Sequence, residues 1–491
     1  MKDKIIKIII ITIALFLVFS QLIIYLINYL GITKYNYLAW GILHFENSSL
    51  KILIYSVLAV IITILVMIPK INNLILNNIK LFSKIKIKGN IINYFIITII
   101  SFIIFYIFRI TNTVISKDHW GIIAERALID PSRFIFMSGS LTGYINFIFF
   151  RITNHFFGWN SFFAVEMMHL VYGTLMFIFI LIMCNSFLKY NEFLKSNLQK
   201  ILLIFLITST GFSQFFFGWW EGTTAGFMWT ILYIHTSYLF LRKKISFVYP
   251  VLVFWLAFFF HAVAFWFAPS LLFLYFVNTK VKKLSFKNFF KGIFSVKFLK
   301  LILLLLIPTI LLFIIYEISL YNGFGVHIYN IEQVKIGNLL GGGDATLFIP
   351  LTSSGIDTVW EHFTMFSFAH FIEFLNLNIL NMPFGLLPLI FLLIIYKKKI
   401  NLKDPFIHYL LIFISFFLMC MITFNLDYME KAVWDIYSPL GVLYTILNSY
   451  ILINCADKNT FETVALIMII AGLAITIPWV LSNSAYAYLL Q

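Results

Sequence analysis

A carboxylate and an imidazole stand side by side at Asp118 and His119, just after a long apolar run. Such a pair can act as a general base, and a carboxylate in this setting can bind a divalent cation such as Mg²⁺ or Mn²⁺. We therefore take Asp118 and His119 as candidate catalytic residues, with Asp118 the candidate ligand if a metal is used. A solvated cap at the end of a helix would explain the same carboxylate equally well.

Three arginines near this pair could bind a phosphate group. Arg109 lies inside an apolar run, where a charge is costly and often functional, although the run ends close enough for its side chain to reach the surface. Arg126 and Arg133 follow on the polar segment, and their forked guanidinium groups suit phosphate oxygens. All three are candidate substrate-binding residues. Pairing of the last two with Glu125 and Asp130 is the alternative.

Further along the chain, single polar residues interrupt aromatic stretches. Glu221 follows Trp219 and Trp220 between two apolar runs. Tryptophans are common at membrane interfaces, which explains the two rings but not the carboxylate. Glu221 is therefore a candidate catalytic residue. Candidate substrate-binding residues are Trp220, His261 and His370, although a hydrogen-bonded structural role is the alternative for each histidine.

A last polar cluster joins two apolar runs near the end of the sequence. Asp427 and Asp435 are eight residues apart, close to two helical turns, so a helix would bring them to related faces. Lys431 and Trp434 lie between them. These four residues are candidates for substrate binding. A polar hairpin between two membrane spans is the alternative.

The elements that carry these residues are expected to be membrane helices. The 491-residue chain is 62% hydrophobic and 11% charged, with a mean hydropathy of +0.96. Several runs approach the ~20 apolar residues that cross a bilayer as a helix, and a helix satisfies its own backbone groups in lipid. The runs lack the alternating pattern of a membrane β-barrel. The sequence thus predicts an all-α membrane protein.

We expect about 13 transmembrane helices, from the length and polarity of the runs. Their predicted ranges are 5–30, 51–69, 91–115, 161–186, 201–217, 222–241, 246–260, 262–279, 299–320, 371–396, 405–425, 436–454 and 461–482. The expected organisation is an N-terminal transmembrane hairpin (1–90), a core (91–454) and a C-terminal transmembrane helix (455–491). The segment 140–157 mixes polar and apolar residues, which predicts a helix lying in the membrane interface.

The connectors between the predicted spans alternate in charge. The net charge is +15, and most lysines fall in every second connector, where they set membrane orientation and do not indicate nucleic acid binding. This pattern predicts a multi-pass protein of the plasma (cytoplasmic) membrane with its N-terminus inside. The acidic motifs would then lie on the outer face. Two outer loops, 116–160 and 321–370, are longer than a connection needs, which is typical of functional loops.

Several pieces of the sequence, taken in order, resemble the polytopic GT-C glycosyltransferases. The sequence has no nucleotide-binding or hydrolase motif. The similar pieces are Asp118 followed by the segment 140–157, Phe217-Gly218-Trp219-Trp220-Glu221, His261 with Pro269, the run 370–376 leading to Pro383-Phe384-Gly385, and Asn425-Leu426-Asp427 with Trp434-Asp435. The chain departs from the family in two ways: two spans precede the one before Asp118, and His119 stands where a second acid is common.

This resemblance implies an enzyme of cell-envelope polysaccharide biosynthesis that uses a polyprenyl-phosphate sugar as donor. The acceptor would be a glycan or a lipid, and Asp118 would be the base or the metal partner. Because His119 replaces the second acid, a metal requirement does not follow. Two alternatives are a polysaccharide polymerase or ligase that uses a lipid-linked oligosaccharide, and a flippase or transporter of lipid-linked glycans. The flippase would need polar residues through the depth of the membrane.

Overall fold

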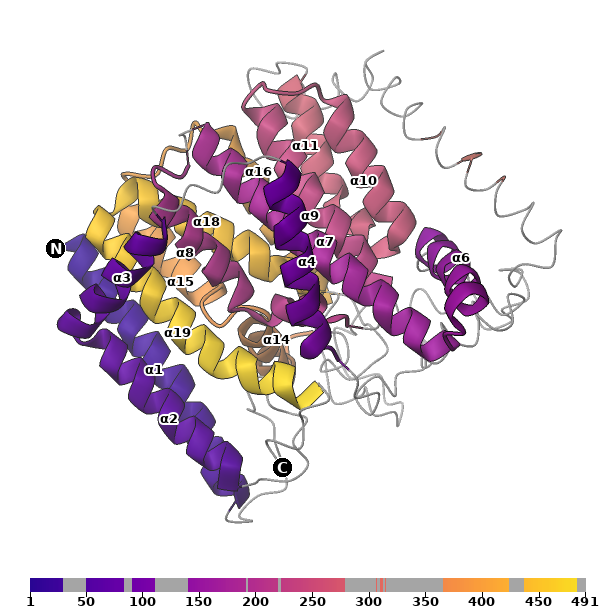
Figure 1. Ribbon diagram of the computed structural model, residues 1–491. Helices are drawn as coiled ribbons and strands as arrows, with labels where there is room; N and C mark the ends of the chain where they lie inside the picture. Colours follow the sequence, from indigo (N-terminus) through magenta and orange to yellow (C-terminus); the bar gives the residue numbers. More distant parts are fainter. Residues whose placement is uncertain are drawn as a thin grey trace.

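The apolar runs form helices, and these helices are the regular structure of the described part of the chain (Figure 1). The computed structural model describes residues 1–29, 50–83, 91–110, 140–190, 193–219, 222–278, 365–423 and 437–483, together with Leu306, Ile310, Leu311 and Ile314. For these residues the predicted all-α class is confirmed.

The helices fall into three stretches of sequence. The first holds α1 (Lys2–Tyr29), α2 (Leu50–Met67), α3 (Pro69–Ser83) and α4 (Ile91–Ile107). The second holds α6 (Ser140–Phe157), α7 (Ser161–Lys189), α8 (Asn197–Thr208), η3 (Gly211–Phe217), α9 (Gly222–Leu241), α10 (Val248–Phe260), η4 (Ala262–Phe267) and α11 (Ala268–Asn278). The third holds α14 (Phe368–Asn381), α15 (Leu386–Tyr396), α16 (Pro405–Thr423), α18 (Pro439–Cys455) and α19 (Lys458–Asn483).

Several of these helices have the length and composition of membrane spans, which indicates a membrane protein. Among the described residues, five helices are long and apolar enough to cross a bilayer, or up to seven if each of two bent pairs is one span. The five are Lys2–Leu26, Leu50–Met67, Ser161–Lys189, Pro405–Thr423 and Lys458–Leu481. The number of 13 spans stays a prediction.

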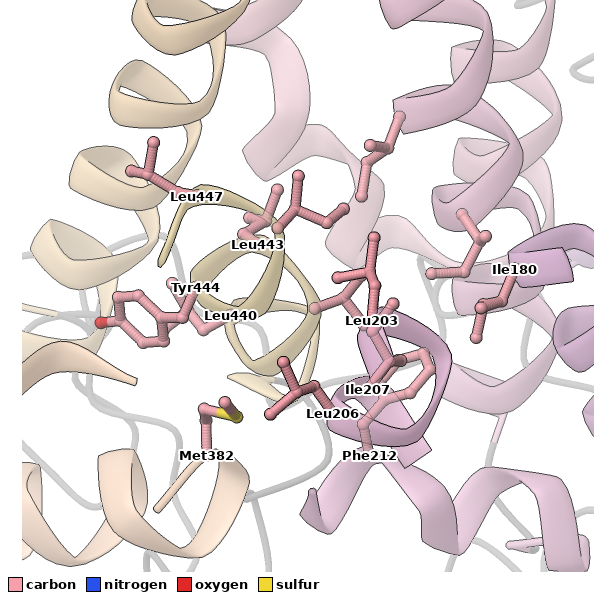
Figure 2. Packing of buried hydrophobic residues seen from close by; sticks show 14 of the residues in the cluster. Ile180, Leu203, Leu206, Ile207, Phe212, Met382, Leu440, Leu443, Tyr444 and Leu447 are labelled. Atoms are coloured by element: carbon pink, nitrogen blue, oxygen red, sulfur yellow. The ribbon is translucent and has the colours of Figure 1, made fainter. Parts of the chain in front are cut away.

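The core lies where α7, α8 and α18 meet. Ile180, Leu203 and Leu443 come from these three helices and are fully buried. Leu206 of α8 lies next to Met382, the buried residue that follows α14 (Figure 2). The pair α1 and α2 lies at one edge of the bundle beside α19 (Figure 1), and many of its apolar side chains are exposed. An edge pair with apolar outer faces is suited to contact with lipid.

Two predicted straight spans are bent in the structure. The predicted span 201–217 consists of α8 and η3, which meet at 85°. The predicted span 371–396 consists of α14 and α15, which meet at 88°. Apolar content alone predicted both as single helices, and it carries no information on where a helix breaks.

The bends have a local and a tertiary cause. The hydroxyl groups of Ser209 and Thr210 donate to the carbonyls of Leu206 (3.0 Å) and Ile207 (2.8 Å). These side-chain hydrogen bonds compete with the backbone hydrogen bonds that would continue the helix. The two breaks also touch one another. A Cβ on Gly211 would lie 2.3 Å from the carbonyl oxygen of Leu380, so only glycine allows this approach of the two backbones.

Two helices outside the predicted spans also appear. The segment 140–157 forms a helix, α6, as predicted, and its position in the membrane interface stays a prediction. Helix α3 was not expected, because its sequence reads as a lysine-bearing connector. It lies against the start of α19, where the Nζ atom of Lys80 is 3.4 Å from Oε2 of Glu462.

The helix ends gather into two groups at opposite ends of α7. We call one group the lysine end: the start of α1, the ends of α7, α9, α15 and α18, and the starts of α16 and α19. The Tyr396 hydroxyl donates to Oδ1 of Asp3 (2.6 Å), and Lys244 lies 4.8 Å from the centre of the Tyr190 ring. This grouping agrees with the predicted alternation of connectors, and the side of the membrane that it faces stays a prediction.

We call the opposite group the histidine end. It holds the ends of α4, α10 and α16 and the starts of α7, α9 and α14. Glu166 and Lys189 are 23 residues apart on α7, so about 35 Å of helix separates the two ends at 1.5 Å per residue. The sequence-predicted site residues that the structure describes, Arg109, His261 and His370, all lie at the histidine end.

Candidate functional site

An ion pair joins the end of α4 to the start of α7. The Nε atom of Arg109 donates to Oε1 of Glu166 at 2.6 Å, and Nη1 donates to the carbonyl of Tyr106 at 3.1 Å. The guanidinium also lies 4.3 Å from the centre of the Tyr106 ring. Glu166 is buried, whereas the Arg109 side chain is 24% exposed. Within the described part of the chain, the second terminal nitrogen of Arg109 has no hydrogen-bond partner.

The backbone next to this pair brings two candidate segments together. The amide of Ile110 donates to the carbonyl of Phe217 at 2.9 Å. Ile110 is the last described residue before the segment that carries Asp118, and Phe217 comes four residues before Glu221. The first turn of α9 follows at once, and the hydroxyl of Thr224 donates to the carbonyl of Trp219 at 2.7 Å.

His261 lies at the corner between α10 and η4, against the first turns of α9. A Cβ on Gly226 would lie 2.6 Å from Cβ of His261, so the backbone of α9 packs directly against the base of the His261 side chain. The Nδ1 atom of His261 accepts a hydrogen bond from the amide of Val263 at 3.2 Å. In the neutral ring the proton is therefore on Nε2, which can donate to a ligand. The Thr142 hydroxyl donates to the carbonyl of Phe260 (2.6 Å), which holds α6 over this corner.

His370 joins the start of α14 to the end of α16. Its Nε2 atom lies 3.2 Å from the carbonyl of Ile422, and its own amide donates to the hydroxyl of Ser367 at 3.2 Å. Ile422 precedes the segment that carries Asp427 to Asp435. After that segment the Tyr437 ring lies 5.4 Å from the Trp266 ring of η4, five residues from His261.

Ten sequence-predicted site residues lie outside the described residues. They are Asp118, His119, Trp220, Glu221, Arg126, Arg133, Asp427, Lys431, Trp434 and Asp435. Their roles stay predictions. Described residues flank three of their segments: Ile110, the stretch 217–219 with Gly222, and Tyr437.

Sequence reasoning missed polar partners on α6 and α7. It identified Arg109 but not its partner Glu166, which lies 57 residues away and resembles any carboxylate near a helix end. It also passed over Tyr172, whose hydroxyl donates to Oδ1 of Asn146 at 3.1 Å and joins α7 to α6. The recurrence of polar residues in the segment 140–157 was the signal that could have suggested such partners.

The described residues of the histidine end can bind an anion or a hydroxyl-rich ligand. Arg109 offers a donor beside its carboxylate partner, and His261 offers an Nε2–H group. Among the described residues, no group of three or more His, Cys, Asp or Glu side chains could hold a metal ion. The predicted metal ligand, Asp118, lies outside them, so a divalent cation stays a prediction.

Comparisons with known proteins do not assign the chain to a group. No family model matches it, no curated protein matches its sequence, and no solved structure matches its fold.

Proposed function

We propose that this chain is an integral-membrane glycosyltransferase of the GT-C kind. It moves a sugar from a polyprenyl-phosphate donor to a glycan or lipid acceptor at the outer face of the plasma membrane. In this proposal the chain has about 13 spans, from the apolar run lengths, and the histidine end faces outward. The observation that carries the proposal is the meeting of three distant sequence regions near the first turns of α9: Ile110 lies on Phe217, the stretch 217–219 leads toward α9, and His261 lies on Gly226.

Chain length limits how far the candidate base can lie from this meeting point. Asp118 follows Ile110 by eight residues, which span at most ~28 Å when fully extended. Glu221 lies between the described residues Trp219 and Gly222. A carboxylate from each segment can thus reach one ligand bound beside His261.

The proposed chemistry is an inverting transfer. Asp118 removes the proton from the acceptor hydroxyl, whose oxygen forms the new bond to the anomeric carbon. The bond from that carbon to the donor phosphate breaks, and the phosphate leaves with the electron pair. Arg109, with Arg126 and Arg133 from the outer loop, stabilises the negative charge that develops there. His261, Glu221 and Asp435 hold sugar hydroxyls.

The test is sugar transfer by the purified protein in lipid, with a panel of radiolabelled polyprenyl-phosphate sugars. We expect transfer by the natural chain and a loss of at least 100-fold in Asp118→Asn, the usual scale for removal of a general base. The matched control is Asp130→Asn, the same change in the same outer loop, which should keep transfer within about threefold. Equal losses in both variants, or no transfer from any donor, would contradict the proposal.

A flippase or transporter of lipid-linked glycans is the second candidate, and one observation favours it. The breaks between α8 and η3 and between α14 and α15 touch one another, as in transporters whose broken helices form a binding site in the membrane. Asn381 lies at this contact and is 1% exposed, and neither polar atom of its side chain has a partner among the described residues. Flipping of a fluorescent lipid-linked sugar that Asn381→Leu abolishes, with no sugar transfer, would support this candidate over the enzyme.

A further inference from the structure

The lysine end contains a cavity that the proposed transfer does not use. Its volume is about 560 Å³, within the range of pockets that bind small ligands. It opens between the end of α9, the start of α16 and the end of α18. The polar side chains that line it include Arg242, Lys399, Asn401, Lys403, Asp404 and Tyr450.

The single carboxylate of this cavity already has three hydrogen-bond donors as partners. Oδ2 of Asp404 accepts hydrogen bonds from Nη2 of Arg242 (2.8 Å) and from the hydroxyl of Tyr450, and Oδ1 accepts from the amide of Phe406 at 2.9 Å. Asp404 therefore balances the charge of Arg242 and holds it against the wall. The charges of Lys399 and Lys403 have no carboxylate partner in the cavity lining.

The two lysines make the cavity rich in hydrogen-bond donors. The Nζ atom of Lys399 donates to the carbonyl of Cys455 at 3.0 Å, so two of its three hydrogens stay available. Lys403 is exposed at the rim. Three cations against one carboxylate leave a net side-chain charge of +2 in the lining. A ligand with several anionic oxygens on a small centre satisfies these donors best.

We propose that this cavity binds a phosphate group, presented by the headgroup of an anionic membrane lipid. Exposed apolar side chains close in sequence to the lining residues favour a lipid over a soluble phosphate. Leu402, between Asn401 and Lys403, is 56% exposed, and Ile394 on the last turns of α15, five residues before Lys399, is 61% exposed. Exposed apolar side chains next to lysines are typical of segments that lie at a membrane surface, with the chains in lipid and the amines at the headgroups.

The test measures binding of a fluorescent short-chain phosphatidic acid to the purified full-length protein in neutral detergent. The double variant Lys399→Gln/Lys403→Gln removes two cavity donors. Its matched control, Lys397→Gln/Lys398→Gln, removes the same charge from neighbouring exposed lysines that do not line the cavity. We expect the first variant to weaken binding about tenfold or more, the scale of one charged hydrogen bond, and the control to weaken it less than threefold.

Competitors identify the source of the phosphate. Phosphatidylcholine of the same chain length should compete poorly, because its choline group covers the charge of the phosphate. If glycerol 3-phosphate displaces the probe only at far higher concentration than unlabelled phosphatidic acid, the ligand is a lipid. If both compete equally, the cavity is a phosphate site supplied from solution. Equal weakening in the two double variants, or equal competition by phosphatidylcholine, would overturn the proposal.

Discussion

The two ends of the bundle each contain an arginine paired with a buried carboxylate, but the two pairs are built differently. At the lysine end, Asp404 accepts from Arg242, from Tyr450 and from the first turn of α16, and the Arg242 side chain is 11% exposed. At the histidine end, Arg109 forms an ion pair with the buried Glu166, and the Arg109 side chain is 24% exposed. The first arrangement fastens three helices together, whereas the second leaves a guanidinium with capacity for a ligand.

The largest expected effect on stability is at the lysine end. Asp404→Asn leaves the charge of Arg242 unpaired in a mostly buried place. We expect a loss of about 3 kcal/mol in the free energy of unfolding, at the lower limit for a broken buried ion pair because Arg242 keeps some exposure. Unfolding of the purified protein in detergent measures this loss. The double variant Arg242→Met/Asp404→Leu should recover a large part of it, and a loss below about 1 kcal/mol in Asp404→Asn would contradict the structural role.

A second variant tests how tightly the histidine end is packed. Gly226→Ala places a methyl group against His261, with the two Cβ atoms 2.6 Å apart unless the corner shifts. Overpacking of this kind costs about 1–3 kcal/mol in the free energy of unfolding. We also expect sugar transfer to fall more than 10-fold, because displacement of a positioned group by about 1 Å is enough for such a loss. Full transfer with a destabilised fold would remove His261 from the proposed site.

Loss of the ion pair between Arg109 and Glu166 should change donor binding while it changes the free energy of unfolding only slightly. Glu166→Gln keeps an oxygen that accepts from Arg109, so we expect a loss of only about 1 kcal/mol in the free energy of unfolding. The freed charge of Arg109 should bind the donor phosphate more tightly and so lower the KM for the donor. The rate of sugar transfer, measured at several donor concentrations, gives this KM. A stability loss as large as that of Asp404→Asn would mean that both pairs are structural and the contrast between them is wrong.

The smallest expected effect is at the start of α19, where Asp457 caps the helix. Its Oδ1 atom accepts from the amide of Thr460 at 2.7 Å. Burial acts to raise the pKa of Asp457, but hydrogen bonds from Thr460 hold that pKa below its usual value of 3.8. The carboxylate thus stabilises the fold above the unfolded pKa, and this contribution is lost as the pH falls through the folded pKa.

We therefore expect Asp457→Ala to lose about 0.5–1 kcal/mol in the free energy of unfolding at pH 7. The difference from the natural chain should shrink as the pH falls below about 4. Unfolding curves of both proteins at several pH values measure this convergence. A difference that stays constant with pH would show that the charge of Asp457 plays no part.

Composition was sufficient to predict the helical class of the described residues, because this class depends on where apolar runs fall along the chain. The bends at Gly211 and Asn381 could not be predicted, since each break depends on a backbone from another part of the sequence. The same holds for the site. Arg109 and His261 were identified as charges or polar groups in apolar surroundings, but their partners Glu166 and Gly226 are chosen by tertiary packing.

The contact of the first helix with the last ones has a consequence for biosynthesis. Asp3 accepts hydrogen bonds from Tyr396 and from the amide of Asp457, and α1 lies beside α19. Helix α1 is translated before α15 and α19, which cover part of its surface. Among the described helices, α2 is therefore the first partner that α1 can contact during synthesis. A nascent chain that stops before α19 leaves the face of α1 that packs on α19 uncovered.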